Sequence, residues 1–196
     1  FFDTHKLDGY IIPKNDEFFG EYTEPHKDNL KYISNFSGSY GFALILKKKN
    51  YLFVDGRYTQ QATIESNKFF SISTIPKELP YIAIPQKKLK LGFDPRIHTQ
   101  LFLDHFFKKK QWSLIPINKN LIDLVKNKKN NSKIKKFFIL NKKDAGENVK
   151  SKIAKLIRDI KINKIDFIFI SSPENISWLL NLRGADTEFS PITNGY

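Results

Sequence analysis

The chain has 196 residues, 40% of them hydrophobic, so it is long enough to bury one or two cores. It contains no Cys, which excludes disulfides, thiolate nucleophiles and Cys-based zinc sites. Its net charge of +13 permits two classes of anionic partner, nucleic acids and acidic membrane surfaces.

The kind of basic residue argues against a nucleic-acid partner. Of the 33 basic residues only four are Arg, and phosphate or base recognition favours the planar Arg guanidinium. Lys, Asn, Ile and Phe are abundant together, a composition typical of AT-rich codon usage. We therefore interpret the charge as compositional bias, and a basic nucleic-acid binder remains a rival hypothesis. No run of about 18 apolar residues occurs, so we expect no membrane partner.

The first part of the chain alternates short apolar runs with segments of helical pattern. Strands are predicted where β-branched and aromatic residues cluster between turn residues, at 9–12, 42–46, 51–54, 69–75, 89–94 and 112–117. Helices are predicted at 25–33, 57–62 and 98–110. The Lys-rich turn at 47–50 joins two of the strands into a hairpin. This alternation predicts an α/β domain with a mixed sheet flanked by helices.

The histidines give no sign of a metal site. His5, His26, His98 and His105 lie in no metal-ligand spacing such as H-E-x-x-H. The helix predicted at 98–110 has an apolar face that consists of Leu101, Phe102, His105 and Phe106. We therefore expect His105 to be packed in the core. No nucleophile elbow or phosphate-binding loop is present, so we expect no catalytic residue and no metal ligand in this chain.

A charged, Asn-rich segment at 126–136 is nearly free of large apolar residues and is interpreted as a linker. It divides a first domain, 1–125, from a second region, 137–196. The second region is predicted to contain a strand at 137–140, a helix at 145–162, a strand at 165–170 with both faces covered, and a helix that begins at Ser172–Pro173.

Two pairs of matching segments indicate a duplicated domain. Trp178–Gly184 matches Tyr32–Gly38, because an aromatic residue, an Asn and a Gly share the same spacing in both. Lys164–Ile170 matches Lys6–Ile12, since each places a Lys, an apolar residue and an Asp before a predicted strand. Few residues follow Gly184, so we expect the second copy to be truncated. The absence of any Met agrees with a natural N-terminus upstream of residue 1.

Two turns carry charged residues that are candidates for contacts with another molecule. Arg57 follows Asp55 at a strand-to-helix turn, where the helix dipole disfavours a cation. We expect a carboxylate to hold it, either from another domain or a substrate, or from Asp55 or Glu21 of its own fold. In the turn 181–186, Gly184 is expected to take positive φ, Asn181 to satisfy backbone groups and Arg183 to pair with Asp186.

Seven motifs occur in one order: Tyr10-Ile-Ile-Pro13, Glu21-Tyr22, Ile33-x-x-Phe36-x-Gly-Ser39, Asp55-Gly-Arg-Tyr58, Gly92-Phe-Asp-Pro95, Asn120-Leu-Ile-Asp123 and Trp178-Leu-Leu-Asn-Leu-Arg-Gly184. Together they resemble the N-terminal half of the three-domain Xaa-Pro aminopeptidases, the aminopeptidase P family, over nearly the whole chain. The resemblance implies two creatinase-like N-terminal domains, the second incomplete here, ahead of a catalytic domain that this chain lacks.

The activity that the resemblance implies belongs to the whole enzyme. Such enzymes remove the N-terminal residue that precedes proline, with two divalent metal ions, usually manganese, in the C-terminal domain. The resemblance further implies peptide substrates with proline at the second position, a homodimer and a cytoplasmic location. Glu21 matches, by motif position, a Glu that in relatives lies near a neighbouring subunit's active site.

Six residues are expected to shape the substrate entrance or the subunit interface: Glu21, Arg57, Tyr58, Asn181, Arg183 and Asp186. One departure from the family pattern lies beside them, because Phe18-Phe19 stands where relatives usually have His-Gln. The main alternative is a free-standing, non-catalytic binding or dimerisation module. Prolidase or creatinase chemistry is a nearer alternative, disfavoured because those enzymes typically have one such N-terminal domain.

Overall fold

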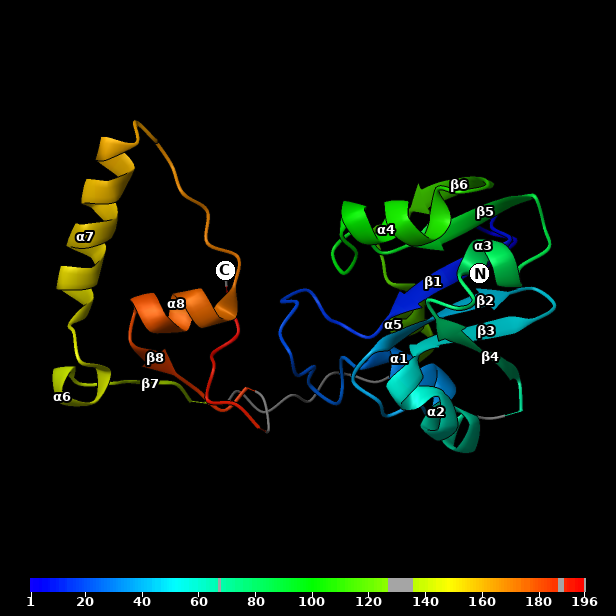
Figure 1. Ribbon diagram of the computed structural model, residues 1–196, viewed down its shortest axis with the longest axis horizontal. Coiled ribbons are helices and arrows are strands. Elements are labelled where there is room, and N and C mark those ends of the chain that lie inside the picture. The colour runs from blue at the N-terminus through cyan, green and yellow to red at the C-terminus, as the bar shows by residue number, and fades with distance from the viewer. Residues whose placement is uncertain (67, 127–135, 187–188, 196) are drawn as a thin grey trace. The chain divides into compact units, whose positions relative to one another are not determined.

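The computed structural model describes residues 1–66, 68–126, 136–186 and 189–195, which form two compact units (Figure 1). The first unit comprises Phe1–Glu17 and Pro25–Asn130, and the second comprises Phe18–Glu24 and Asn131–Tyr196. The linker predicted at 126–136 lies, apart from its two end residues, outside the described residues. The predicted domain boundaries therefore stay predictions.

The first unit is built on a six-stranded mixed sheet with the order β4-β3-β2-β1-β5-β6. Its strands are β1 (Gly9–Pro13), β2 (Gly41–Leu46), β3 (Asn50–Asp55), β4 (Phe70–Ile75), β5 (Lys88–Phe93) and β6 (Gln111–Pro116). β2 pairs antiparallel with β1 and β3, whereas the three other pairings, β3 with β4, β1 with β5 and β5 with β6, are parallel. All six strands were expected from the sequence, and the predicted mixed sheet is confirmed.

Helices cover both faces of this sheet (Figure 1). They are α1 (Asn29–Ser34), the 3-10 turn η1 (Gly56–Tyr58), α2 (Thr59–Glu65), α3 (Pro80–Ala83), α4 (Gln100–Phe107) and α5 (Leu121–Lys126). Side chains of one strand alternate between the faces, so Tyr10 and Ile12 join the core under α1, α2 and α5. Ile11 joins the other core, which Leu103 and Phe107 of α4 close.

Two helix predictions in this unit were wrong in detail. The helix expected at 25–33 begins only at Asn29, because the Asp28 side chain accepts a hydrogen bond from the Lys31 N–H and caps it there. In α4 the buried residues are Leu103, Phe106 and Phe107, whereas Leu101 is 80% exposed. His105 is exposed as well, so the expectation that it packs in the core was wrong. Helices α3 and α5 were not predicted.

A different histidine is the buried one. His98 lies just before the Thr99 cap of α4, is 8% exposed, and contacts the rings of Phe93 and Phe102. Its Nδ1 lies 2.8 Å from the carbonyl oxygen of Asp94. Burial lowers the pKa of His98, because the apolar surroundings disfavour the charged ring.

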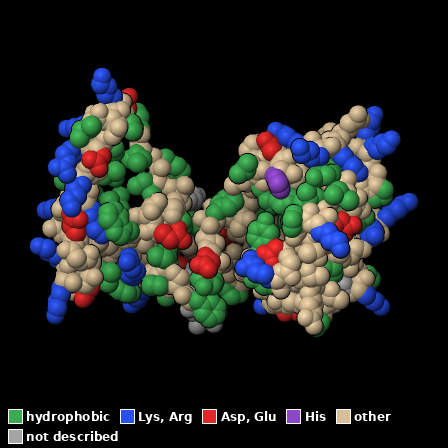
Figure 2. Space-filling model, in the orientation of Figure 1, with side chains coloured by type: hydrophobic (Ala, Val, Ile, Leu, Met, Phe, Trp, Pro, Cys, Tyr) green, Lys and Arg blue, Asp and Glu red, His purple; other side chains and the backbone are tan. Residues whose placement is uncertain are grey.

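The second unit contains little regular sheet. Its elements are the antiparallel strands β7 (Phe138–Ile139) and β8 (Leu182–Arg183) and the helices α6 (Lys142–Ala145), α7 (Val149–Ile162) and α8 (Pro173–Leu179). The single helix expected at 145–162 is interrupted, because Gly146 takes φ +76° and Asn148 caps α7 through the Ser151 N–H. Lys and Arg side chains lie along the outer edge of α7 (Figure 2). The predicted helix start at Pro173 is confirmed.

The predicted strand at 165–170 is absent. This segment has no regular secondary structure and joins neither described sheet, and most of its apolar side chains are exposed. Phe167 is 90% exposed and Phe169 is 78% exposed. An apolar run indicates that a segment suits a sheet, but a strand forms only where a neighbour accepts its backbone hydrogen bonds.

Both pairs of matching segments share a backbone feature that the sequence alone does not show. Lys6 and Lys164, which precede the matched runs, both take positive φ, at 53° and 54°. Asn35 and Asn181, which follow the matched helices, do so as well, at 62° and 52°. These paired left-handed residues support the hypothesis of a duplicated domain.

Candidate functional site

The predicted residues fall into two groups, one in each unit. In the first unit, Arg57 lies in η1, directly after β3. Its Nη2 is 2.6 Å from Oδ2 of Asp55, and its backbone N–H donates to Oδ1 of the same carboxylate. Of the alternatives that the sequence left open, Asp55 is the residue that holds Arg57. The hydrogen bond from Arg57 lowers the pKa of Asp55 below its ordinary value.

Tyr58 lies beside this pair and fixes the loop before β2. The Arg57 guanidinium is 5.2 Å from the centre of the Tyr58 ring, and the Tyr58 hydroxyl is 2.7 Å from the Ser39 hydroxyl. The edge of Phe36 packs on the same ring. A Cβ at Gly38 would lie 2.3 Å from the Phe36 ring, which explains the glycine of this motif. The surface therefore presents a guanidinium and two hydroxyls in fixed positions.

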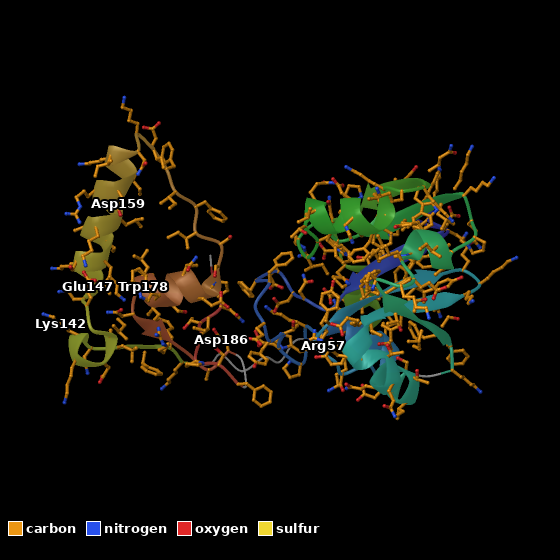
Figure 3. The ribbon with its side chains drawn as sticks, viewed as in Figure 1. Arg57, Lys142, Glu147, Asp159, Trp178 and Asp186 are labelled. Atoms are coloured by element: carbon orange, nitrogen blue, oxygen red, sulfur yellow. The ribbon has the colours of Figure 1, made fainter. Side chains whose placement is uncertain are left out.

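In the second unit, Asn181 is buried and lies at the centre of a hydrogen-bond network. Its side-chain oxygen accepts from Nζ of Lys152 at 2.7 Å, and its amide donates to the carbonyl oxygen of Glu147. Figure 3 labels Trp178 on α8 and Glu147 just before α7. Lys152 is itself 5% exposed, donates to the carbonyl oxygen of Trp178 and lies 4.2 Å from the centre of the Trp178 ring. A buried ammonium is stable only with such partners.

Two expectations about the turn after α8 were wrong. Positive φ falls on Asn181, not on Gly184. Gly184 is instead required by a close approach, since an added Cβ would lie 2.9 Å from Oγ1 of Thr193. The expected pairing of Arg183 with Asp186 is replaced by other hydrogen bonds: Arg183 donates to the carbonyl oxygen of Ser177, and Asp186 accepts from the backbone N–H of Asn194.

Glu21 lines a hollow within the second unit. The hollow has a volume of about 120 Å3, and its lining consists of Gly20, Glu21, Tyr22, Pro173, Glu174, Ser190, Ile192 and Asn194. The sequence pointed to Glu21 only through the family resemblance. It gave no signal for Glu174 or Ile192, because they lie far from Glu21 along the chain and meet it only in the fold.

The described residues do not fit a metal centre. No three or more His, Cys, Asp or Glu side chains come together in the described ranges in a way that could hold a metal ion. A two-metal site of the kind that the resemblance implies therefore cannot be built from these side chains. Among the described residues, no helix is long and apolar enough to cross a membrane.

This mixed α/β architecture is that of a known class of domain. The family model described as "Creatinase/Prolidase N-terminal domain" matches residues 1–132, and a second model with the same description matches residues 127–196. The crystal structure of the X-prolyl aminopeptidase from Caenorhabditis elegans has a similar fold, with a TM-score of 0.85 and 23% identity, over 95% of this chain and 32% of that one.

Since the first family model covers more than half of the residues, the chain belongs to the creatinase/prolidase N-terminal domain family. Curated relatives are named "Probable Xaa-Pro aminopeptidase P". The protein from Laccaria bicolor is 30% identical over 98% of this chain and 32% of its own length. The one from Neosartorya fischeri is 33% identical over 98% of this chain and 31% of its own length. The chain thus spans about a third of the length of these relatives.

Proposed function

We propose that the chain is the N-terminal, substrate-shaping and dimerisation part of a metal-dependent aminopeptidase that removes the residue before a proline. The observation that carries this proposal is the match of 98% of the chain to relatives named Xaa-Pro aminopeptidase P. In the proposed enzyme, two divalent metal ions, by resemblance manganese, are held by residues outside this chain. A cytoplasmic location is proposed because the C. elegans neighbour is described as a cytosolic enzyme with a di-nuclear active site.

This chain's own part in the proposal is to bind and orient the peptide. Asp55 holds Arg57 through Nε and Nη2, so the guanidinium is already oriented and its Nη1 remains available to a peptide carboxylate. Glu21 offers a carboxylate with no hydrogen bond or ion pair among the described residues. The remaining candidate residues hold the turns that would carry these contacts in place. They are Tyr58, Asn181, Arg183 and Asp186.

The proposal is tested with a tripeptide that has proline at the second position and with manganese in the buffer. The purified 196-residue chain is expected to release no N-terminal residue, because its described part lacks a metal site. The longer gene product, if the coding sequence extends past Tyr196, is expected to release it. Turnover by the chain alone would contradict the proposal that the catalytic residues lie outside this chain. Absence of activity in every form of the gene product would favour the non-catalytic binding or dimerisation module.

A further inference from the structure

We propose that the hollow beside Glu21 binds the positively charged side chain of a peptide residue, a lysine or an arginine. Every lining residue belongs to the second unit, from its short segment 18–24 and from the start of α8 and the residues after β8. That the bound molecule is a peptide rests on the proposed function. The chemistry of the hollow is argued from its wall alone.

The wall of the hollow is acidic, whereas the chain as a whole is basic. The chain carries 33 basic and 20 acidic residues, yet the described lining of the hollow contains no Lys or Arg, and it does contain Glu21 and Glu174. Two further carboxylates lie close behind the wall, since Asn194 bonds Glu24 through its side chain and Asp186 through its backbone N–H. A concave surface lined by one sign of charge attracts the opposite ion. The hollow therefore selects a cation and repels a phosphate or a carboxylate.

The two lining carboxylates keep acceptor capacity for a ligand. Two carboxylates of the neighbouring loop and helix start are paired with lysines, Asp28 with Lys14 and Glu17 with Lys27. Glu21 has no such partner among the described residues. Glu174 uses Oε2 to accept from the Ser172 hydroxyl at 2.6 Å, which leaves Oε1. An ammonium or guanidinium would supply the donors that these oxygens lack.

The remaining wall distinguishes an organic cation from a metal ion. Among the described lining residues two carry a carboxylate, and the described residues contain no group of three ligands that could hold a metal. Tyr22, Pro173 and Ile192 provide apolar surface instead, and the Tyr22 ring is braced by Phe189 at a centroid distance of 5.6 Å. Lysine and arginine carry an aliphatic stem below the charge, which packs on such a surface while the charge meets the carboxylates.

The volume of about 120 Å3 fits one side chain and not a folded partner. Because the contact is small and open to solvent, we expect weak binding, with a dissociation constant on the order of 1 mM. Binding in the hollow would favour peptides with a basic residue over peptides with a neutral residue of the same shape.

The test is a titration of the 196-residue chain, followed by NMR chemical shifts, with Nα-acetyl-lysine N-methylamide. The matched probe is the norleucine derivative, which has the same stem without the charge. We expect the lysine probe to shift the amides of residues 20–22 and 190–194, and the norleucine probe to bind at least fivefold more weakly. Glu21→Gln and Glu174→Gln are each expected to weaken lysine binding at least threefold, and the double variant to abolish it.

Glu147→Gln serves as the control variant, because Glu147 lies in the second unit but does not line the hollow. It is expected to leave lysine binding unchanged. The proposal is overturned if the two probes bind equally, if the lysine probe shifts no amide of the hollow, or if Glu147→Gln weakens binding as much as Glu21→Gln. These outcomes concern the hollow only, whereas peptide turnover tests the proposed function.

Discussion

The matched segments Lys6–Ile12 and Lys164–Ile170 begin alike and end in different surroundings. Both start with a Lys at nearly the same positive φ, followed by an apolar residue and an Asp. The first continues as β1, between an antiparallel and a parallel neighbour, with Ile11 fully buried. The second pairs with no strand of the described residues, and Ile168 is 52% exposed. Sequence thus determines the local turn, whereas neighbouring strands determine whether a β-strand forms.

The aligned positions Gly9 and Phe167 show the same difference at a single residue. A Cβ at Gly9 would lie 2.4 Å from the Leu46 side chain and 2.6 Å from the carbonyl oxygen of Ile45. At the matching position the large Phe167 side chain is 90% exposed. The neighbouring strand β2 leaves no space for a side chain in the first case, and no described strand occupies that place in the second.

The largest expected difference comes from truncating one isoleucine in each of the two matched segments. Ile11→Ala is expected to lower the free energy of unfolding of the first unit by about 2–5 kcal/mol, because it opens a cavity in the core. Ile168→Ala is expected to change the unfolding of either unit by less than about 0.5 kcal/mol, because its side chain already meets water. Urea unfolding is followed by tryptophan fluorescence, since Trp112 reports on the first unit and Trp178 on the second.

A Trp178→Phe background isolates the Trp112 signal for this comparison. Equal losses for the two isoleucine variants would contradict the difference in packing. In the chain that retains Trp178, a loss of about 2–5 kcal/mol for Ile168→Ala in the Trp178 transition would contradict it as well.

A smaller difference is expected at the aligned pair Gly9 and Phe167. Gly9→Ala is expected to destabilise the first unit by about 1–3 kcal/mol, because Leu46 and the backbone of β2 must move. Phe167→Ala is expected to leave stability nearly unchanged and to reduce self-association, because it removes exposed apolar surface. Urea midpoints and light scattering at several protein concentrations measure the two effects. A stable Gly9→Ala variant would show that β2 does not pack as described.

The sequence predicted the elements whose local residue pattern agreed with their packing. It failed where packing against a distant part of the chain determined the structure. All six strands of the first unit were identifiable because each has clustered β-branched, aromatic or aliphatic residues and a neighbour in the sheet that pairs with it. The same kind of run at 165–170 was misread, since nothing in its own residues reveals a missing partner. His105 was misplaced because α4 buries the face of Leu103, Phe106 and Phe107 and leaves Leu101 and His105 exposed. The hollow was invisible in sequence, because Glu21 and Glu174 approach only through the fold.

The repeated asparagines allow a third comparison. Asn35 is exposed and Asn181 is buried, although both take positive φ. Asn35→Gly is expected to change stability by only a few tenths of a kcal/mol, because glycine adopts positive φ readily. Asn181→Gly is expected to cost about 1–3 kcal/mol, because the ammonium of Lys152 loses an acceptor in a buried site. The urea transition of Trp178 measures the second effect, and equal costs at both positions would refute the role assigned to Lys152.

The smallest expected difference lies in pH dependence. All four histidines belong to the first unit, and burial lowers the pKa of His98. A lowered folded-state pKa means that the unfolded chain binds the proton more readily. Stability of the first unit should therefore fall as pH drops below the unfolded value of 6.5, by at most about 1.4 kcal/mol per pH unit. His98→Asn is expected to remove this component.

His105→Asn is the matched comparison variant, because it replaces an exposed histidine of the same unit. Unfolding midpoints between pH 5 and pH 8, read from Trp112 and from Trp178, give both profiles. A histidine-dependent slope in the Trp178 transition would contradict the assignment, because the second unit has no histidine.

The most direct test of the central claim is amide hydrogen exchange of the two matched segments in one sample of the chain. The account predicts that amides of 10–12 exchange only on global unfolding of the first unit, because β1 is paired on both edges. Amides of 166–170 are predicted to exchange at nearly the rate of an unstructured peptide. Equal and strong protection of both segments would contradict the claim that matching sequences here have different strand neighbours.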